Sequence, residues 1–377
     1  MNTKKWKRRR DWLPAAGGDR PPVELTLRES GAWVVAMKRL LPLMVLVALG
    51  ASCVSARPDR VKLTPLADRV RVEIDGQLFT EYVYGDGASR PYCYPILAAD
   101  GTSLTRDFPM KETPGEEHDH PWHRALFFAH SMVNGVDFWN EAGGDAGKSP
   151  QDKGKSVHDS IVTWSGGASG TIHTKNRWIA PDGRLICTDD RTLRFSPADA
   201  DGRFIDFEIT LHALPGTPLL IGDNKDGTMA IRVAQWMTAP HIIKSKNAAG
   251  KSIETNFPGV GHIINAAGDT DATAWGKRAN WCDYYAPRDG KTYGVAIFDH
   301  PQNLRHPTWW MARDYGLFGA NPFGQHDYEG LKDQPHIGDY TIPAGGSLTL
   351  RYRFYFHMGD EKAANVAGHY ADYAAGK

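Results

Sequence analysis

Alternation of apolar and polar residues with a period of two constrains the fold of this chain more than any other feature. In "RVRVEIDGQLFTEYVY" (69–84), Val70, Val72 and Ile74 alternate with charged residues before a turn at Asp75. The stretches "GRFIDFEITLHAL" and "GGSLTLRYRFYF" repeat the pattern. Because successive side chains of a strand face opposite sides of a sheet, each stretch predicts a strand with one buried face. Many such strands separated by short turns predict an all-β fold, a large two-sheet β-sandwich.

No internal repeat of fixed period and no linker interrupts this pattern. We therefore expect residues 57–377 to form a single β-sandwich domain. The one sustained helical pattern is "GDEKAANVAGHYADYAAGK" at the end of the chain, where Asp360 can cap a short helix.

The first 56 residues predict export. Residues 37–56, "MKRLLPLMVLVALGASCVSA", place a charged start before an apolar run too short to span a bilayer and a cleavage site of small residues, as in a signal peptide. In that case residues 1–36 are an over-called N-terminal extension, that is, sequence upstream of the true start of the protein. Cys53 offers a lipid anchor as an alternative, so the protein is expected in the periplasm or outside the cell, either soluble or lipid-anchored.

The charge balance of the body excludes one class of partner. Of 44 basic and 44 acidic residues, 34 basic and 40 acidic ones follow residue 56, so this part is mildly acidic. Nucleic-acid binding needs a basic face, and we expect no nucleic-acid partner. Three cysteines follow the signal, Cys93, Cys187 and Cys282, with no paired spacing. They are interpreted as buried thiols, with one bridge at most.

A histidine cluster is the first candidate site. The stretch "EEHDHPWHRALFFAH" contains His118, His120 and His123 within six positions, and no histidine precedes them. Imidazoles suit zinc, copper, iron or nickel, and the flanking acids Glu117 and Asp119 can act as ligands or hold the rings. The alternatives are a divalent metal bound by these three histidines and direct hydrogen bonding to a substrate. A fourth histidine, His130, ends an apolar run and is expected to be buried.

A second cluster lies far along the chain. Residues 278–324 combine acids, histidines, arginines and aromatic side chains at strand ends, where sites are built on β scaffolds. Such a mixture is typical of a carbohydrate site, with hydrogen-bonding groups, stacking rings and acid/base groups. From both clusters we predict these catalytic residues: His300, His306, Asp283, Asp314, Arg313 and Arg124. The predicted substrate-binding residues are Trp122, Trp139, Asn134, Trp309, Tyr315, Asn321 and His158.

Four motifs carry a resemblance to a known family. They are "HDHPWHRALFFAHSMVNGVDFWNE", "GDNKDGTMAIRV", "HPTWWMARDYGLFGANPFG" and "YTIPAGGSLTLRYRFYFHMGD". Together they resemble an exported bacterial family catalogued as PmoA-like or methane oxygenase PmoA, a domain of unknown function, over about residues 60–360. That family often has histidines where this chain has Trp122 and Met311, so these positions are not obligatory ligands. The label refers to a subunit of transmembrane helices, whereas this chain has no such run after its signal.

The closing motif also resembles the last strands of galactose-mutarotase-like super-sandwiches, which implies a sugar bound on a concave face. We therefore expect an exported carbohydrate-active enzyme, acting by hydrolysis, elimination or epimerisation on a saccharide or glycan-derived small molecule. In this hypothesis His300 or His306 is the base or acid, Asp283 or Asp314 orients it, and Arg124 and Arg313 bind a carboxylate or a developing enolate. A non-catalytic glycan-binding protein is the alternative, and a metal-dependent oxidase is a distant third.

Overall fold

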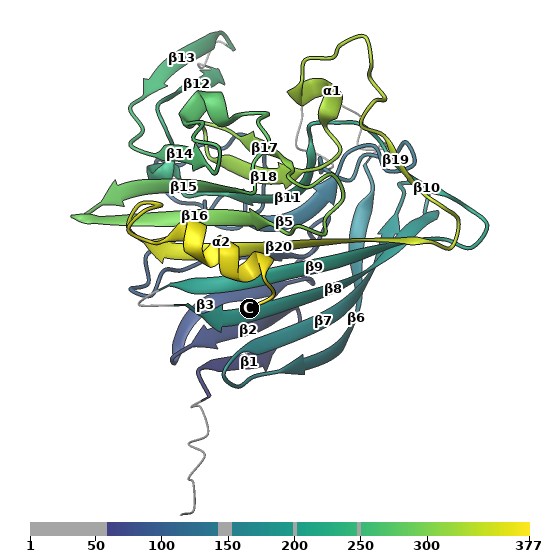
Figure 1. Cartoon of the computed structure of the whole chain (residues 1–377), viewed down its shortest axis with the longest axis horizontal. Coiled ribbons are helices and arrows are strands. Elements are labelled where there is room, and N and C mark those ends of the chain that lie inside the picture. Colours follow the sequence, from purple (N-terminus) through teal and green to yellow (C-terminus); the bar gives the residue numbers. More distant parts are fainter. Residues whose placement is uncertain (1–58, 142–152, 199–201, 247–249) are drawn as a thin grey trace, which may run out of the picture. The chain divides into compact units, whose positions relative to one another are not determined.

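The computed structural model describes residues 59–141, 153–198, 202–246 and 250–377. Within them, two antiparallel sheets of eight strands each form the framework (Figure 1). The first sheet has the order β1 (Val61–Pro65), β2 (Arg69–Ile74), β3 (Gln77–Val83), β4 (Tyr92–Cys93), β5 (Leu126–His130), β11 (Gly227–Arg232), β18 (Leu317–Asn321), β17 (Trp309–Ala312).

The second sheet has the order β14 (His262–Asn265), β15 (Trp281–Arg288), β16 (Lys291–Asp299), β20 (Ser347–Met358), β9 (Arg203–Ala213), β8 (Leu185–Pro197), β7 (Gly170–Ile179), β6 (Lys155–Ser165). The remaining elements are two two-stranded sheets, β10 (Leu219–Ile221) with β19 (Tyr340–Ile342) and β12 (His241–Lys246) with β13 (Ser252–Phe257), and the short helices η2 (Gln235–Met237), η3 (Asp271–Ala274), α1 (Gln325–Tyr328) and α2 (Val366–Ala374).

The core lies between the inner faces of the two sheets. Along β9, every second residue from Arg203 to Ala213 is buried, as the alternation in the sequence requires. Ile205 and Phe207 of the second sheet belong to the same apolar cluster as Phe128 of the first, and the rings of Phe128 and Phe207 lie 6.4 Å apart. This is the packing of a β-sandwich, in which the inward residues of both sheets form one core.

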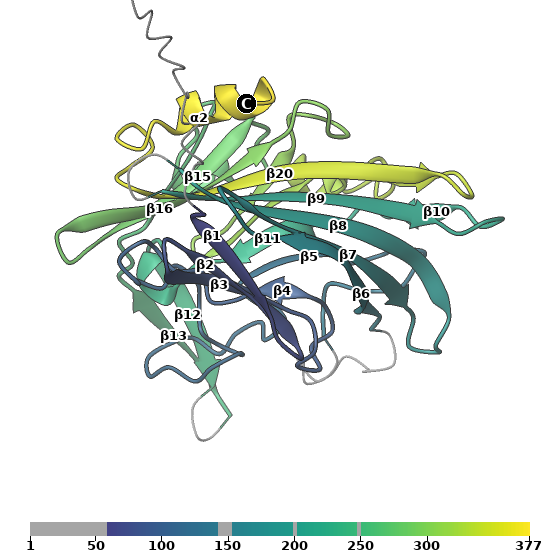
Figure 2. The same ribbon diagram turned by 90° about the horizontal axis from the view of Figure 1, so that it is seen from below.

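Each sheet also has an apolar patch on its outer face. On the second sheet, α2 covers residues of β16 and β20, with Val366 and Tyr373 packed near Phe298 (Figure 2). On the first sheet the outer residues Phe127 and Met311 form a separate cluster, which loops and Tyr328 of α1 cover. The loops over this second patch carry the histidine cluster, so the outer face of the first sheet is where the candidate site lies.

The predicted all-β sandwich and short C-terminal helix are confirmed. Asp360 accepts backbone hydrogen bonds from Lys362 and Ala363 in the turn that precedes α2. Cys93, Cys187 and Cys282 are buried free thiols. No helix in the described ranges is long and apolar enough to cross a bilayer. The predicted extension, signal peptide and Cys53 anchor lie outside the described residues.

The buried pair Asp189–Arg191 gives a test of this core. Both side chains are fully buried, and the carboxylate accepts two hydrogen bonds from the guanidinium and one from Trp178. Asp189→Ala leaves a buried cation uncompensated, so we expect it to lower the free energy of unfolding by about 3–5 kcal/mol in chemical denaturation. The control is Asp182→Ala at an exposed turn, expected to cost less than about 1 kcal/mol. Equal effects of both variants would contradict the packing described.

Candidate functional site

A pocket of about 360 Å³ opens on the outer face of the first sheet. Its lining residues come from both clusters predicted from the sequence and from one segment that neither cluster includes. They are His120, Trp122, His123, Trp139, Asn140, Lys225, Asp226, Met311, Arg313, Tyr315 and Leu317.

Strand pairing explains why residues so distant in sequence meet here. β5 follows the histidine loop, β11 follows the turn that carries Lys225 and Asp226, and β18 follows the turn that carries Arg313 and Tyr315. β11 pairs with β5 on one side and with β18 on the other. Both pairings are antiparallel, so the segments before β5 and β18 meet beside the end of β11, and the two sequence clusters meet there through residues 120–123 and 311–317. The turn before β11 reaches the pocket from the other end of these strands.

A column of parallel rings forms one wall of this pocket. The His120 ring stacks on Tyr315 with centroids 5.4 Å apart and on His123 with centroids 4.7 Å apart, both at an angle of 3°. His123 continues the column onto Phe127 at 6.3 Å. His120 adopts a left-handed backbone conformation with φ 43°, which places its ring between its neighbours.

Asp119 fixes the orientation of His120. One carboxylate oxygen, Oδ1, binds the guanidinium groups of Arg106 and Arg232, the latter at 2.8 Å, and the other binds Nδ1 of His120. Both arginines are buried. Burial alone would raise the pKa of Asp119, but the bond to His120 and the charges of Arg232 and Arg106 outweigh it and hold this pKa well below its usual range. Because Nδ1 of His120 faces a carboxylate, it carries the proton, and Nε2 is left as a base.

His123 is a different kind of imidazole. It is 1% exposed, and burial, together with the nearby charges of Arg232 and Arg106, holds its pKa well below the ordinary value. It therefore stays neutral at physiological pH. His130 is buried, as expected from the sequence, and its Nε2 lies 2.7 Å from the carbonyl oxygen of Gly222.

Asp226 and Lys225 form the opposite part of the lining. Burial raises the pKa of Asp226, and the nearby carboxylates Asp137 and Asp327 add to this effect, although Lys225 and Arg313 oppose it. The Lys225 Nζ lies 3.9 Å from Oδ2 of Asp226. A carboxyl group with a raised pKa inside a pocket is a candidate proton donor.

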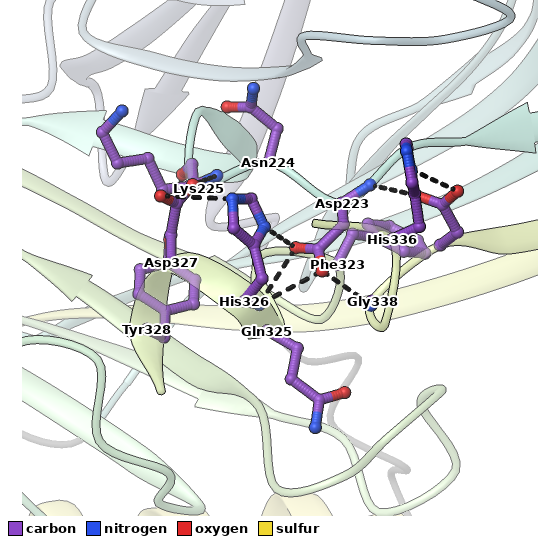
Figure 3. A network of polar contacts seen from close by, with 12 residues as sticks. Asp223, Asn224, Lys225, Phe323, Gln325, His326, Asp327, Tyr328, His336 and Gly338 are labelled. Carbon is purple, nitrogen blue, oxygen red and sulfur yellow. Dashed lines mark hydrogen bonds and ion pairs between the residues drawn. The ribbon is translucent and has the colours of Figure 1, made fainter. Parts of the chain in front are cut away.

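A polar network behind the pocket holds the turn that carries these two residues (Figure 3). Asp327 accepts a hydrogen bond from the backbone N–H of Lys225 at 2.9 Å. His326, on α1, lies between the two acids, with Nδ1 2.8 Å from Asp223 and Nε2 3.5 Å from Asp327. Asp223 is buried and also accepts the backbone N–H groups of His326 and Gly338. The network fixes the backbone of residues 223–225, and with it the position of Asp226.

Arg313 brings a guanidinium group to the pocket. It packs over the ring of Trp275 at 4.6 Å, and within the part of the chain that the structure describes it forms no ion pair with a carboxylate. Its charge is therefore available to a ligand.

The three histidines proposed as metal ligands do not converge. His118 is exposed, stacks on Phe108 at 4.3 Å and pairs with Glu112 at 3.1 Å, outside the pocket. His120 and His123 lie face to face, so their nitrogen lone pairs point along parallel planes rather than toward one ion. No group of three ligand-type side chains suited to a metal occurs among the described residues.

The catalytic pairings predicted for the second cluster are not formed. His306 Nδ1 lies 2.7 Å from buried Asp299, not from Asp283 or Asp314. Asp283 is buried beside His357 at 3.1 Å, because alternation along β15 turns it to the outer face of the second sheet. The Asp314 side chain is exposed and accepts the N–H of Tyr315.

His300 belongs to another pocket. That pocket lies on the outer face of the second sheet, where His300 packs against Tyr373 of α2 at 5.2 Å. His300, predicted to be catalytic, therefore does not share a pocket with His120 and His123. The strand that ends at Asp299 belongs to the second sheet, so the residue that follows it is carried away from the first.

Arg124 and Asn134 have structural partners. Arg124 makes a two-pronged contact with Glu141, at 2.9 and 3.0 Å, and does not line the pocket. Its charge is thus already paired and not free for a substrate carboxylate. Asn134 binds the backbone of Leu220 and Pro218 in a turn, which positions β10.

Three further residues predicted to bind substrate lie outside the pocket. His158 packs on Tyr84 at 4.2 Å, at the start of β6. Trp309 is 2% exposed and donates to Glu329 at 3.1 Å. Asn321 is buried and donates to the carbonyl oxygens of Asn224 and Lys225, so it supports the pocket from behind. Trp122, Trp139 and Tyr315 do line the pocket.

Sequence reasoning missed Asp226 and Lys225 as site residues. In the stretch "GDNKDGTMAIRV", polar residues stand directly before a mostly apolar strand and so mark a strand end. That signal was present, but which polar residue faces the pocket depends on contacts with α1.

The fold and the pocket define a class, an antiparallel two-sheet sandwich with a charged, aromatic-lined pocket on the outer face of one sheet. A family model described as a family of unknown function, DUF6807, matches residues 69–371, and the chain belongs to this family. No curated protein matches the chain. The family description does not link the chain to PmoA-like proteins, so that resemblance stays a prediction.

The buried histidines predict a pH response. Burial lowers the pKa of His130 to about 4, from 6.5 in the unfolded chain. Between these two pH values the unfolded state binds a proton at His130, whereas the folded state does not. Stability should therefore fall as the pH drops from 6.5 to 4, by up to about 1.4 kcal/mol per pH unit for this group. Histidine NMR, with His130→Asn for assignment, should give a midpoint near 4. A midpoint near 6.5 would contradict the buried, neutral imidazole.

Proposed function

We propose that this protein is a carbohydrate-active enzyme whose pocket on the first sheet performs proton transfer on a bound saccharide. The observation that carries the proposal is that one pocket combines a carboxyl group of raised pKa, Asp226, with an imidazole oriented by a carboxylate, His120. Acid/base chemistry needs two such groups, one to give and one to take a proton.

His120 is suited to the role of base. Asp119 holds the proton on Nδ1, and stacking between Tyr315 and His123 prevents the ring from turning over. A carboxylate fixes the tautomer and orientation of the histidine in the same way in a Ser-His-Asp triad. Asp226 is suited to the role of acid, because it lines the same pocket and burial raises its pKa.

The remaining lining suits a sugar ring. Trp122 and Trp139 contribute aromatic surface to the wall, and Tyr315 contributes its ring edge, because His120 and Arg232 cover its faces. Asn140 and Lys225 provide hydrogen-bond donors for hydroxyl groups. A volume of about 360 Å³ lies at the lower end of the range for small-molecule sites, enough for one or two sugar units.

A non-catalytic glycan-binding protein is the second candidate. The aromatic lining supports it equally, and only the acid/base pair favours an enzyme. Export, through the signal expected at 37–56, and the lipid anchor at Cys53 belong to the same proposal. A divalent metal at His118, His120 and His123 requires these rings to rearrange. Elemental mass spectrometry of the wild type beside His120→Ala tests that cofactor.

Removal of the two proton-transfer groups tests the proposed enzyme. On a substrate found by screening saccharides, Asp226→Asn and His120→Gln should each lower kcat by about 10²-fold or more, because general acid–base groups contribute that much. Binding of the saccharide, measured by calorimetry, should change far less.

Asp289→Asn, at an exposed turn, is the matched carboxylate control and should leave kcat unchanged. Retention of full activity in both pocket variants would exclude these acid/base roles. Binding of glycans without turnover of any would instead favour the non-catalytic protein.

A further inference from the structure

We propose that the saccharide bound in this pocket is acidic, and that Arg313 and Lys225 bind its anionic substituent, a carboxylate or a sulfate ester. This inference rests on the proposed function and names the substrate class of the same pocket. It follows from the excess of positive over negative charge in the described lining of the pocket.

The positive charges of the lining exceed its negative charges. Arg313 and Lys225 face a single carboxyl group, Asp226. Asp226 is the single acid among the described lining residues, and burial raises its pKa. An anionic ligand restores the balance.

The acids close to the pocket cannot supply this balance. Asp119 is bound by two buried guanidinium groups and by His120. Glu141 is held by Arg124, and Asp137 is held by Lys153. Each of these carboxylates is matched or outnumbered by its own cations. Among the described residues this leaves Arg313 without a paired carboxylate, and Lys225 with Asp226 alone, at 3.9 Å.

The Arg313 guanidinium group is held in a position that suits binding of a planar or tetrahedral anion. Its guanidinium group packs over the face of Trp275 at 4.6 Å, which holds the fork in place, and no acceptor among the described residues binds its N–H groups. Two parallel N–H donors match the paired oxygens of a carboxylate or a sulfate. Lys225 adds a flexible ammonium group, 41% exposed, beside the Asp226 carboxyl group.

The size and walls of the pocket limit what carries the anion. The pocket is small and partly aromatic, so a single acidic sugar ring fits it better than an extended polyanion. An anionic group on a ring stacked against the aromatic wall would meet the cations at the pocket edge. Uronic acids and sugar sulfates share this chemistry.

Titration calorimetry on the full-length chain tests the inference, with glucuronic acid, galacturonic acid, glucose 6-sulfate and glucose as probes. We expect the acidic sugars to bind at least about tenfold more tightly than glucose, since hydrogen bonds to charged groups are worth that much. Arg313→Gln should remove this preference and leave the affinity for glucose within about threefold.

Two further variants complete the design. Arg288→Gln is the matched control, because Arg288 also packs over a tryptophan, Trp236, at 4.9 Å, but outside the pocket. If Arg313→Gln unfolds, Lys225→Gln tests whether the preference for acidic sugars over glucose is lost. The sulfate and carboxylate probes separate the two sources of negative charge, and binding of either kind supports the inference.

Equal affinity for glucose and the acidic sugars in the wild type would overturn the acidic-substrate inference and leave the proposed function standing. The same holds if Arg313→Gln and Lys225→Gln both keep the preference. Binding of no saccharide at all, in a screen that extends to larger glycans, would overturn the proposed function together with this inference.

Discussion

Asp119 and the two arginines that bind it determine the geometry of the whole histidine loop. Arg106 and Arg232 are both buried, and burial and mutual repulsion lower the pKa of Arg106 to about 10, so it remains charged at neutral pH. Two buried cations side by side are costly unless an anion joins them. Asp119 is that anion, and its second oxygen is then directed at His120. The position of the candidate base thus follows from a requirement for charge neutralisation beneath it.

Buried charged groups also fix the part of the pocket that Lys225 and Asp226 form. Asp223 is buried and accepts hydrogen bonds from backbone N–H groups of α1 and of the loop at Gly338. Asp327 of α1 accepts a hydrogen bond from the backbone N–H of Lys225. Asn321 adds two bonds to the same turn. Side chains of α1 and β18 therefore hold the turn that carries Asp226, although none of them lines the pocket. Rigid support behind a few exposed groups is what acid/base chemistry requires.

The parts of the fold that follow from local periodicity were predictable, and the parts that depend on tertiary contacts were not. Alternation along β9 and β20 predicted strands with one buried face, and the apolar run before His130 predicted a buried imidazole. Spacing alone could not show that His118 turns outward onto Phe108 while His120 turns inward.

Sheet membership was the main source of error in the site. Residues 278–324 looked like one cluster in the sequence, but β15 and β16 belong to the second sheet and β17 and β18 to the first. His300 and Arg313 consequently lie in different pockets. Asp226 was overlooked because its raised pKa arises from burial and from carboxylates about 90 and 100 positions away in sequence, Asp137 and Asp327. No local sequence pattern indicates such an electrostatic environment.

The most direct test of the account is a crystal structure of the protein soaked with a panel of neutral and acidic saccharides. The account predicts a sugar in the pocket of the first sheet, against Tyr315 and Trp122, within reach of His120, Asp226 and Arg313. A sugar bound only in the His300 pocket of the second sheet, or a histidine loop rearranged around a metal ion, would contradict it.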